Sequence, residues 1–405
     1  MSDTRSRPGL RTLPAGIWAL GFVSLLMDVS SEMIHALLPV YLVVGLGTSA
    51  LAVGVIEGIA EATAAITKVF SGAISDWLGR RKLLAVIGYG LAALTKPLFP
   101  LADSVGWLVT ARFIDRFGKG IRGAPRDALV ADIAPPGQRG AAFGLRQALD
   151  TVGAFLGPAL AVLLMWLTAD NFKAVFWVAV IPAVLCVVVL VLFVKEPRRP
   201  AGQRQVRSPL AWKELERLRP AYWAVTAVAT LFTLARFSEA FLLLRAQSGG
   251  LAIALVPLVL VAMNIAYSLS AYPAGALADR TNALGVLVAG VAMLVAANLL
   301  LAIDGLVALG AGVLLWGLHM GFTQGLFASL VAATAPAELR GTAFGMFNML
   351  GGLALLVASV FAGWLWSVVG PSATFVSGAI IATASLGALL LLRGRFPELG
   401  ATVPE

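Results

Sequence analysis

The sequence predicts an all-α polytopic membrane protein whose twelve transmembrane helices form two pseudo-symmetric six-helix bundles. The 405 residues are 59% hydrophobic and only 13% charged, whereas soluble domains average about 25% charged residues. Apolar stretches of roughly 20 residues, the length that crosses a bilayer, recur along the chain. The two halves of the chain also share sequence motifs. Together these observations exclude a soluble enzyme built around one core.

Six apolar spans are predicted in each half of the chain. A run of prolines and basic residues separates the halves and predicts a cytoplasmic linker. We therefore divide the chain into a first bundle (1–195), a basic linker (196–220) and a second bundle (221–405). The predicted spans are 17–45, 50–76, 83–102, 105–131, 140–168, 174–195, 221–247, 251–278, 284–303, 305–334, 341–369 and 371–393.

The basic residues predict the orientation of the chain. The loop after the second span holds Arg80, Arg81 and Lys82, and the linker is densely basic, whereas the loops on the opposite side hold only Lys173 and Arg245. The positive-inside rule therefore predicts a multi-pass protein of the inner (plasma) membrane with both termini in the cytoplasm. Because the net charge of +9 is accounted for by these loops, we expect contacts with membrane lipids and no nucleic-acid partner.

Two motifs recur in corresponding loops of the halves. V-A-D-I-A-P-P-G-Q-R-G-A-A-F-G (130–144) matches V-A-A-T-A-P-A-E-L-R-G-T-A-F-G (331–345), and G-A-I-S-D (72–76) matches G-A-L-A-D (275–279). The copies follow the second and fourth spans of each half, on the same predicted side. The halves are therefore predicted to be parallel repeats, related by an axis along the membrane normal.

Three motifs carry a resemblance to a known family. G-A-I-S-D-W-L-G-R-R-K (72–82) resembles the loop 2–3 signature of the major facilitator superfamily, G-x-x-x-D-x-x-G-R-R. L-V-T-A-R (108–112) is similar to its fourth-span signature, which contains a membrane-embedded arginine. G-A-F-L-G-P (153–158) is similar to the Gly-x-x-x-Gly-Pro element of its drug/proton antiporters. The resemblance implies two bundles that rock around a central cavity lined by the first, fourth, seventh and tenth spans, and it implies no substrate.

The fourth predicted span carries a charged stripe, R-F-I-D-R-F-G-K-G-I-R-G-A-P-R-D (112–127). At roughly 100° per residue, its charges fall within a sector of about 120°. Charged groups at membrane depth are costly and persist where they face a bundle interior or a water-filled path. We expect them to meet acidic faces on spans one, two and five. We further expect Arg112 to Arg116 to face the cavity, and Lys119 to Asp127 to belong to a cytoplasmic gate.

Carboxylates recur at helical spacing inside the predicted spans. Asp28, Glu32 and His35 share one face of the first span, and Glu57 and Glu61 share one face of the second. Embedded carboxylates near arginines are the groups from which membrane transporters build proton relays. The predicted substrate and proton-coupling residues are Asp28, Glu32, His35, Glu57, Glu61, Arg112, Asp115, Arg116, Arg146, Asp150, Arg236, Glu239 and His319.

A second set of residues lies near the predicted cytoplasmic surface, where the repeated motifs fall. Acidic and basic side chains alternate there, and their pairing would stabilise one conformation of the protein. The predicted gate residues are Gly72, Asp76, Gly79, Arg80, Arg81, Lys119, Arg122, Arg126, Asp127, Asp132, Arg139, Asp279 and Arg340.

These features predict a proton-coupled secondary transporter for a small, amphipathic, anionic or zwitterionic organic solute. The proton gradient supplies the energy, no cofactor is expected, and we expect a monomer. The Gly-x-x-x-Gly-Pro element favours export by proton antiport, and proton symport into the cell is the alternative.

Two further classes remain as alternatives. His35 and His319 suggest transport of a transition metal, but two histidines alone do not complete a four-ligand site, so we predict no metal site. A non-transporting receptor or scaffold is the alternative of a different class. We find no Gly-x-Ser-x-Gly or His-Glu-x-x-His motif, so no enzymatic activity is predicted.

Overall fold

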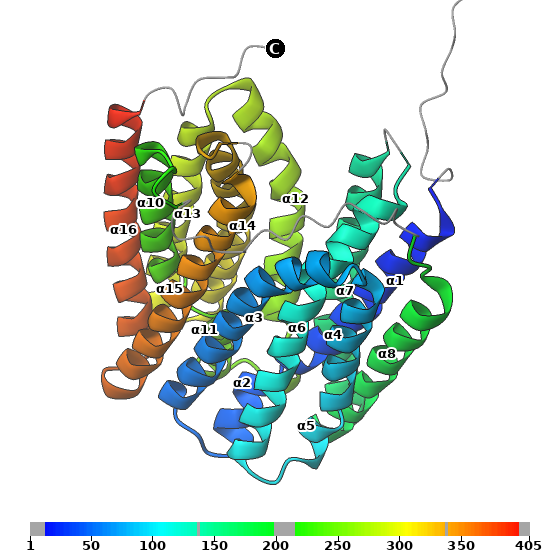
Figure 1. Ribbon diagram of the computed structural model, residues 1–405. Coiled ribbons are helices and arrows are strands. Elements are labelled where there is room, and N and C mark those ends of the chain that lie inside the picture. The colour runs from blue at the N-terminus through cyan, green and yellow to red at the C-terminus, as the bar shows by residue number, and fades with distance from the viewer. Residues whose placement is uncertain (1–12, 136–137, 198–214, 337–338, 397–405) are drawn as a thin grey trace, which may run out of the picture.

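The computed structural model describes residues 13–135, 138–197, 215–336 and 339–396. Each predicted span lies within two residues of a helical segment at both of its ends. Figure 1 shows two groups of helices side by side, one from each half of the chain. We call the face that carries the start of α1 and the end of α16 the terminal face, and the opposite face the loop face.

The first bundle contains six membrane-crossing segments. Its strongest helix pairings are α1 with α7 and α8, and α6 with α3 and α4. The elements are α1 (Ala15–His35), α2 (Leu38–Val40), the π-helical turn η2 (Tyr41–Gly45), α3 (Ala50–Leu78), α4 (Arg81–Thr95), α5 (Leu98–Leu101), α6 (Val105–Ile133), α7 (Arg139–Leu167) and α8 (Phe172–Phe193).

The second bundle repeats this arrangement, with α14 packed on α12 and α13, and α16 packed on α13 and α10. Its elements are α10 (Pro220–Ala235), α11 (Ala240–Ser248), the 3₁₀ turn η3 (Ile253–Leu255), α12 (Leu258–Arg280), α13 (Ala283–Ala302), α14 (Leu306–Thr334), α15 (Arg340–Val368) and α16 (Pro371–Arg395). Most of the predicted linker, 198–214, lies outside the described residues.

Eleven helical segments of the described chain are long and apolar enough to cross a membrane. The twelfth, α6, is as long as α3 but carries the charged stripe, so composition alone does not mark it as a span. It nevertheless packs between α3 and α4. The stripe is therefore tolerated because neighbouring helices surround it.

The first span of each half is interrupted within the membrane. α1 ends at His35, and the helix resumes at Leu38 with Pro39 in its first turn, where the missing N–H of proline is tolerated. α10 ends at Ala235, and α11 begins at Ala240. At this second break the Ser359 hydroxyl of α15 accepts a hydrogen bond of 3.1 Å from the Ser238 N–H. A side chain thus replaces the helical partner that the break removes.

The two bundles meet toward the loop face, mainly through α3 and α15. Ser367 of α15 accepts a hydrogen bond of 3.1 Å from the Leu51 N–H of α3. Further along the same interface, Gly363 lies against the Ala50 carbonyl and Gly352 lies against Ala65. Because a side chain at either glycine would meet the other helix, these residues permit the close approach of the two bundles.

Candidate functional site

A cavity of about 290 Å³ lies between the bundles, on the terminal-face side of these contacts. Its walls come from α1, α3, α6 and α7 of the first bundle and from α12 of the second. The lining residues are Asp28, Glu32, Lys68, Lys119, Arg122, Gly123, Arg126, Gln147, Asp150, Thr151, Ala154, Asn264 and Tyr267. The first bundle contributes every charge, and the second contributes an amide and a phenol.

The Gly-x-x-x-Gly element of α7 positions the two carboxylates of α1. A side chain at Gly153 would meet the Leu25 carbonyl at 2.7 Å and the Asp28 β-carbon at 2.9 Å. A side chain at Gly157 would meet the Glu32 β-carbon at 2.7 Å. α1 therefore lies directly on these glycines, which hold the backbone of Asp28 and Glu32 at the cavity wall.

The two α1 carboxylates differ in their partners. Glu32 lies 3.2 Å from Nδ1 of His35, and Nε2 of His35 lies 3.7 Å from Glu57. Within the described chain, no basic nitrogen lies within 4 Å of the Asp28 carboxylate. Of the predicted coupling carboxylates of α1, only Asp28 thus reaches the cavity without a close cationic partner.

The loop-face part of the α6 stripe, from Arg112 to Arg116, is buried in ion pairs with neighbouring helices. Arg112 lies 2.6 Å from Glu57, and Arg116 lies 3.3 Å from Glu61. The two arginines are only 1% and 2% exposed. The prediction that α6 meets an acidic face of the second span is confirmed, but the prediction that Arg112 to Arg116 face the cavity is wrong for this conformation. Pairing them inside the bundle avoids leaving ionised groups unpaired at membrane depth.

Asp115 has an ion-pair partner that the sequence did not predict. Lys96, at the junction of α4 and α5, lies 2.8 Å from the Asp115 carboxylate and donates a hydrogen bond of 3.0 Å to Ser31. Lys96 is 1% exposed and Asp115 is 2% exposed, so this pair also lies away from the cavity. The sequence signal that could have pointed to Lys96 is a lysine followed by proline at the end of an apolar span.

A second ion-pair cluster joins α6 to α7 at the cavity wall. Arg146 lies 2.6 Å from Asp150, four residues along α7, and 3.8 Å from Asp127. Arg126 lies 3.1 Å from Asp127 and 3.8 Å from Asp150. The predicted meeting of α6 with the acidic face of the fifth span is therefore confirmed.

Three residues predicted for the gate line the cavity instead. Lys119 is exposed to it, Arg126 belongs to the cluster above, and the Arg122 guanidinium lies 4.7 Å from the centre of the Tyr89 ring. The predicted division of the stripe is therefore reversed, because its loop-face part is buried and its terminal-face part lines the cavity. The α3–α6 contact covers Arg112 and Arg116 and continues past Lys119 to Gly120 and Ala124, but it leaves the Lys119 side chain exposed to the cavity.

The rest of the predicted gate lies at the terminal face. Arg81 lies 2.7 Å from Asp132 and donates to the Ala128 carbonyl at 2.8 Å, while its N–H donates to Glu196 at 2.6 Å. Gly79 ends α3 at a φ of 64°, which glycine adopts without strain. Gly72 faces Ala124 of α6, and Arg80 and Arg340 are exposed. The side chains of Asp76, Arg139 and Asp279 lie outside the described parts of the chain.

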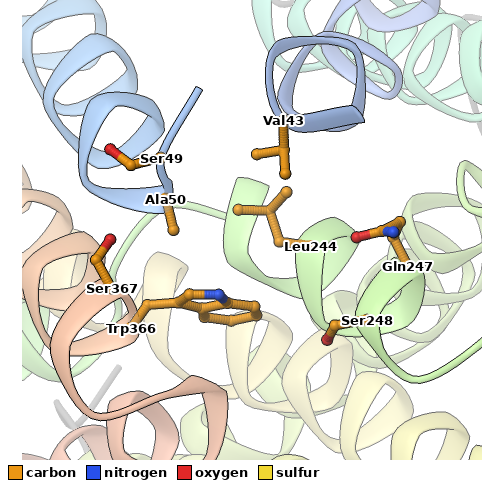
Figure 2. A pocket seen from close by; sticks show the side chains of 8 residues that line it. All are labelled: Val43, Ser49, Ala50, Leu244, Gln247, Ser248, Trp366 and Ser367. Atoms are coloured by element: carbon orange, nitrogen blue, oxygen red, sulfur yellow. The ribbon is translucent and has the colours of Figure 1, made fainter. Parts of the chain in front are cut away.

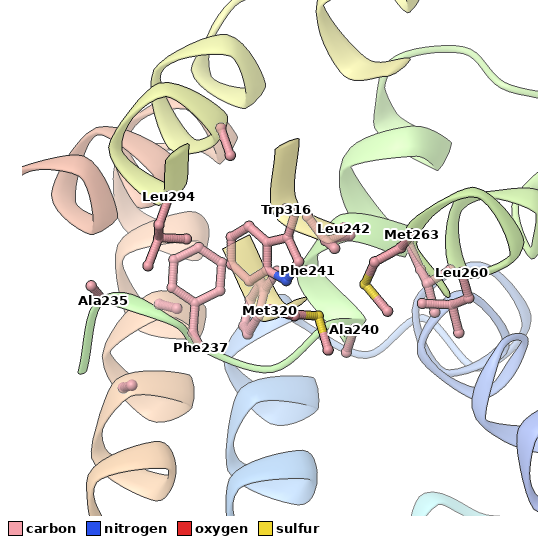
Figure 3. Close-up of a cluster of buried hydrophobic side chains, with 14 of the residues drawn as sticks. Ala235, Phe237, Ala240, Phe241, Leu242, Leu260, Met263, Leu294, Trp316 and Met320 are labelled. Atoms are coloured by element: carbon pink, nitrogen blue, oxygen red, sulfur yellow. The ribbon is translucent and has the colours of Figure 1, made fainter. Parts of the chain in front are cut away.

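The predicted site residues of the second bundle lie near the break between α10 and α11. Arg236 and Glu239 are its first and last residues and are partly buried. His319 of α14 is fully buried between the Trp316 and Phe232 rings. Figure 3 shows the apolar side chains around this break, with Phe237 beside Phe241 and Trp316.

The histidines predicted as a metal alternative lie in different environments. His35 contacts acids of the first bundle, and His319 contacts aromatic rings of the second. Among the described residues, no group of three His, Cys, Asp or Glu side chains is arranged to hold a metal ion.

A separate hollow of about 310 Å³ lies at the loop face, between the two bundles. Figure 2 shows Val43 and Leu244 pointing toward each other above Trp366 of α15. Ser49, Ser367, Gln247 and Ser248 supply its polar rim. In contrast to the central cavity, none of its lining residues is charged.

The comparisons with known proteins agree with this architecture. A family model for the Major Facilitator Superfamily matches residues 20–358 and 240–404. An uncharacterised MFS-type transporter of Methanocaldococcus jannaschii is 33% identical over 401 residues, which cover 94% of this chain and 95% of that protein. The multidrug resistance protein MdtH of Photorhabdus laumondii is 30% identical over 216 residues, which cover 53% of this chain and 52% of MdtH.

A solved structure extends the agreement to the fold. A POT family transporter in complex with 5-aminolevulinic acid has a TM-score of 0.80 at 13% identity, and the match covers 96% of this chain and 98% of that one. At that identity the likeness concerns the fold alone. From the family model and the relative that spans nearly the whole chain, we conclude that this protein belongs to the Major Facilitator Superfamily of membrane transporters.

Proposed function

We propose that this chain is a proton-coupled secondary transporter of a small amphipathic organic solute that is anionic or zwitterionic. It works by alternating access in the inner membrane, with the terminal face in the cytoplasm, and it exports the solute in exchange for protons. Three observations support this proposal: the cavity between the bundles, the contacts that close it toward the loop face, and the basic loops at the terminal face.

The observation that carries the proposal is Asp28 at the cavity wall without a basic nitrogen within 4 Å. A carboxylate of this kind takes up or releases a proton without first breaking an ion pair. Glu57, Glu61 and Asp115 differ, because each is paired with a buried cation. We therefore assign proton coupling to Asp28, and we assign the buried pairs to the stability of the first bundle.

Two observations support the direction and the class of solute. The similarity to MdtH, a multidrug resistance protein, covers half of this chain and favours export. The cavity has one charged wall and one wall that presents Asn264 and Tyr267. A molecule with an ionised group and an organic body fits between such walls.

The experiment uses everted membrane vesicles and 1-naphthalenesulfonate as a fluorescent probe. The sulfonate stays ionised across the pH range used, so any pH dependence reports on the protein. With an acidic lumen, we expect wild-type vesicles to accumulate the probe. Asp28→Asn should abolish the part of this uptake that depends on the pH gradient but leave probe exchange without a gradient, and the surface variant Asp304→Asn serves as the control. Full gradient dependence in Asp28→Asn would refute the assignment.

The native solute is identified by a separate measurement. Metabolites inside and outside cells are compared between a deletion strain and its parent. Under the proposal, an organic anion or zwitterion accumulates inside the deletion strain. Depletion of such a compound inside that strain would instead indicate import by symport.

A further inference from the structure

We propose that Lys68 of α3 and Lys119 of α6 form the subsite that binds the negatively charged group of the transported solute. The inference rests on the proposed function, since it places part of the solute within the cavity of that site. It assigns anion binding to two lysines, whereas the sequence predicts Arg112, Arg116 and Arg236 among the substrate and proton-coupling residues.

Several arginines of the α6 stripe are already engaged by carboxylates. Arg112 and Arg116 are buried against Glu57 and Glu61. Arg126, which does line the cavity, is held by Asp127, Asp150 and the Ser24 hydroxyl. A guanidinium engaged in this way would have to exchange one carboxylate for another in order to bind a solute.

Lys68 and Lys119 are different. Both side chains are exposed, both line the cavity, and within the described residues neither has a carboxylate within 4 Å. Glu61, Glu32 and Asp28 act on Lys119 only from a greater distance. Glu61 is engaged by Arg116, and Glu32 lies against His35. Arg122 lines the cavity without an ion pair as well, but it is 5% exposed and lies over the Tyr89 ring. The two ammonium groups are therefore the exposed cations of this wall that can accept an anion without losing a partner.

The backbone places the two lysines on the same wall. The stem of Lys68 passes over Gly123 of α6, where an added β-carbon would lie 3.5 Å from its Cε and 3.6 Å from its Cδ. Lys119 lies four residues before Gly123, on the same face of α6. The Lys68 stem thus lies on α6 at Gly123, one helical turn from the position of Lys119. Two ammonium groups that line the same cavity one helical turn apart suit the separate oxygens of a carboxylate, sulfonate or phosphate.

The opposite wall of the cavity indicates that the rest of the solute is an uncharged organic body. Tyr267 and Asn264 of α12 face this charged wall and carry no charge. An organic body that packs on the phenol and bonds to the amide, with its anionic group toward the lysines, contacts both bundles at once. The substrate class is therefore an organic anion. Asp28 of the same cavity is left for the proton.

The experiment measures binding to the purified full-length protein in nanodiscs of zwitterionic lipid, without any gradient. Three probes share one body: 1-naphthalenesulfonate, neutral 1-naphthol and 1-naphthyltrimethylammonium. We expect the wild type to prefer the sulfonate. Lys68→Gln and Lys119→Gln should each weaken its binding about tenfold, the loss expected for one charge-assisted contact. The control is Lys173→Gln, because that lysine lies at the loop face and is 49% exposed.

A charge-reversal variant distinguishes loss of the subsite from misfolding of the protein. The double variant Lys68→Glu/Lys119→Glu should prefer the ammonium probe, a gain that an unfolded protein does not produce. Unchanged sulfonate binding in the double glutamine variant, or wild-type preference for the ammonium probe, would overturn the subsite. A second set of nanodiscs also contains phosphatidylglycerol. Displacement of the sulfonate in these discs would overturn the subsite as well, because the site would then belong to a lipid headgroup.

These outcomes are distinguishable from those that test the proposed function. Binding without a gradient does not depend on proton coupling. Intact sulfonate binding with no gradient-driven uptake would refute the proposed coupling and keep the subsite. Gradient-driven uptake that survives in Lys68→Gln/Lys119→Gln would refute the subsite and keep the coupling.

Discussion

The two bundles have the same helix arrangement but interiors of opposite chemistry. In the first bundle, the stretch of α6 from Arg112 to Arg116 alone takes part in four cation–carboxylate pairs: Arg112–Glu57, Arg116–Glu61, Arg116–Asp115 and Lys96–Asp115. In the described part of the second bundle, the one ion pair joins Arg245 to Asp304, whose side chain is 90% exposed. At the corresponding depth the second bundle holds packed rings. The fold therefore constrains how helices pack, and it leaves open whether charge or volume holds them.

This difference determines what each half can do. An ion pair holds its helices only while both partners are present, whereas packed rings respond mainly to the volume they fill. Under the proposed function, the first bundle binds charge and protons at its cavity wall, and the second moves against it with a wall that presents Asn264 and Tyr267.

The largest effect is expected from Glu57→Leu. The change removes the partner of Arg112 and leaves a guanidinium unpaired at 1% exposure. Breaking a buried pair in this way destabilises by about 3–5 kcal/mol. Thermal unfolding of the purified protein in detergent measures this loss.

The double variant Glu57→Leu/Arg112→Leu removes both charges. It tests whether the unpaired Arg112 causes the loss of stability in Glu57→Leu. It should recover most of the stability that Glu57→Leu loses. If the double variant is less stable than either single variant, the pair does not act as a unit, and the comparison between the bundles loses its basis.

In the second bundle, the corresponding test changes volume. Phe237 lies at the break between α10 and α11. The centre of its ring lies 5.4 Å from the ring centre of Phe241, 5.5 Å from that of Phe375 and 5.7 Å from that of Trp316. Phe237→Ala should cost about 3 kcal/mol because the neighbours cannot fill the space, and Phe237→Leu should cost less than half of that. Unfolding in low and high salt should give the same loss, and a strong salt dependence would contradict a role of volume alone.

The sequence predicted the helices well because their signals are local. Apolar length located eleven spans, and the position of 105–131 between two of them located the twelfth. The acidic faces at helical spacing predicted that α6 pairs with α3 and α7. The sequence did not predict which charges of the stripe reach water, because that depends on which side chains of α6 are covered by the neighbouring helices. Lys96 was missed for the same reason, since only the fold brings the α4–α5 junction beside Asp115.

The breaks in the first and seventh spans were also not predicted. Pro39 marks the first of them, but a proline inside an apolar run does not show whether a helix bends or stops. The second break has no proline between Arg236 and Glu239. It is stabilised by Ser359, far along the chain, and such a contact leaves no local pattern.

A smaller effect tests whether the two bundles move as separate bodies. Gly352 lies against Ala65, whereas a side chain at the adjacent Gly351 would meet nothing within 4 Å. Gly352→Leu should cost about 1–3 kcal/mol and favour the conformation that is open at the loop face. Ala50 lines the loop-face hollow and is 8% exposed. Labelling of Ala50→Cys with a membrane-impermeant maleimide, in a Cys186→Ala background, should therefore become faster. Gly351→Leu is the matched control, and equal labelling in the two variants would refute the role of this contact in closure.

The smallest effect is expected at the one ion pair described in the second bundle. Asp304 is 90% exposed, so water screens its attraction to Arg245, which lies 2.8 Å away. Arg245 also keeps a hydrogen bond of 2.8 Å to the Leu301 carbonyl when Asp304 is changed. Asp304→Asn should therefore alter stability by less than about 1 kcal/mol, several times less than Glu57→Leu. A loss as large as that of Glu57→Leu would mean that charge holds both bundles, and burial would no longer explain the contrast between them.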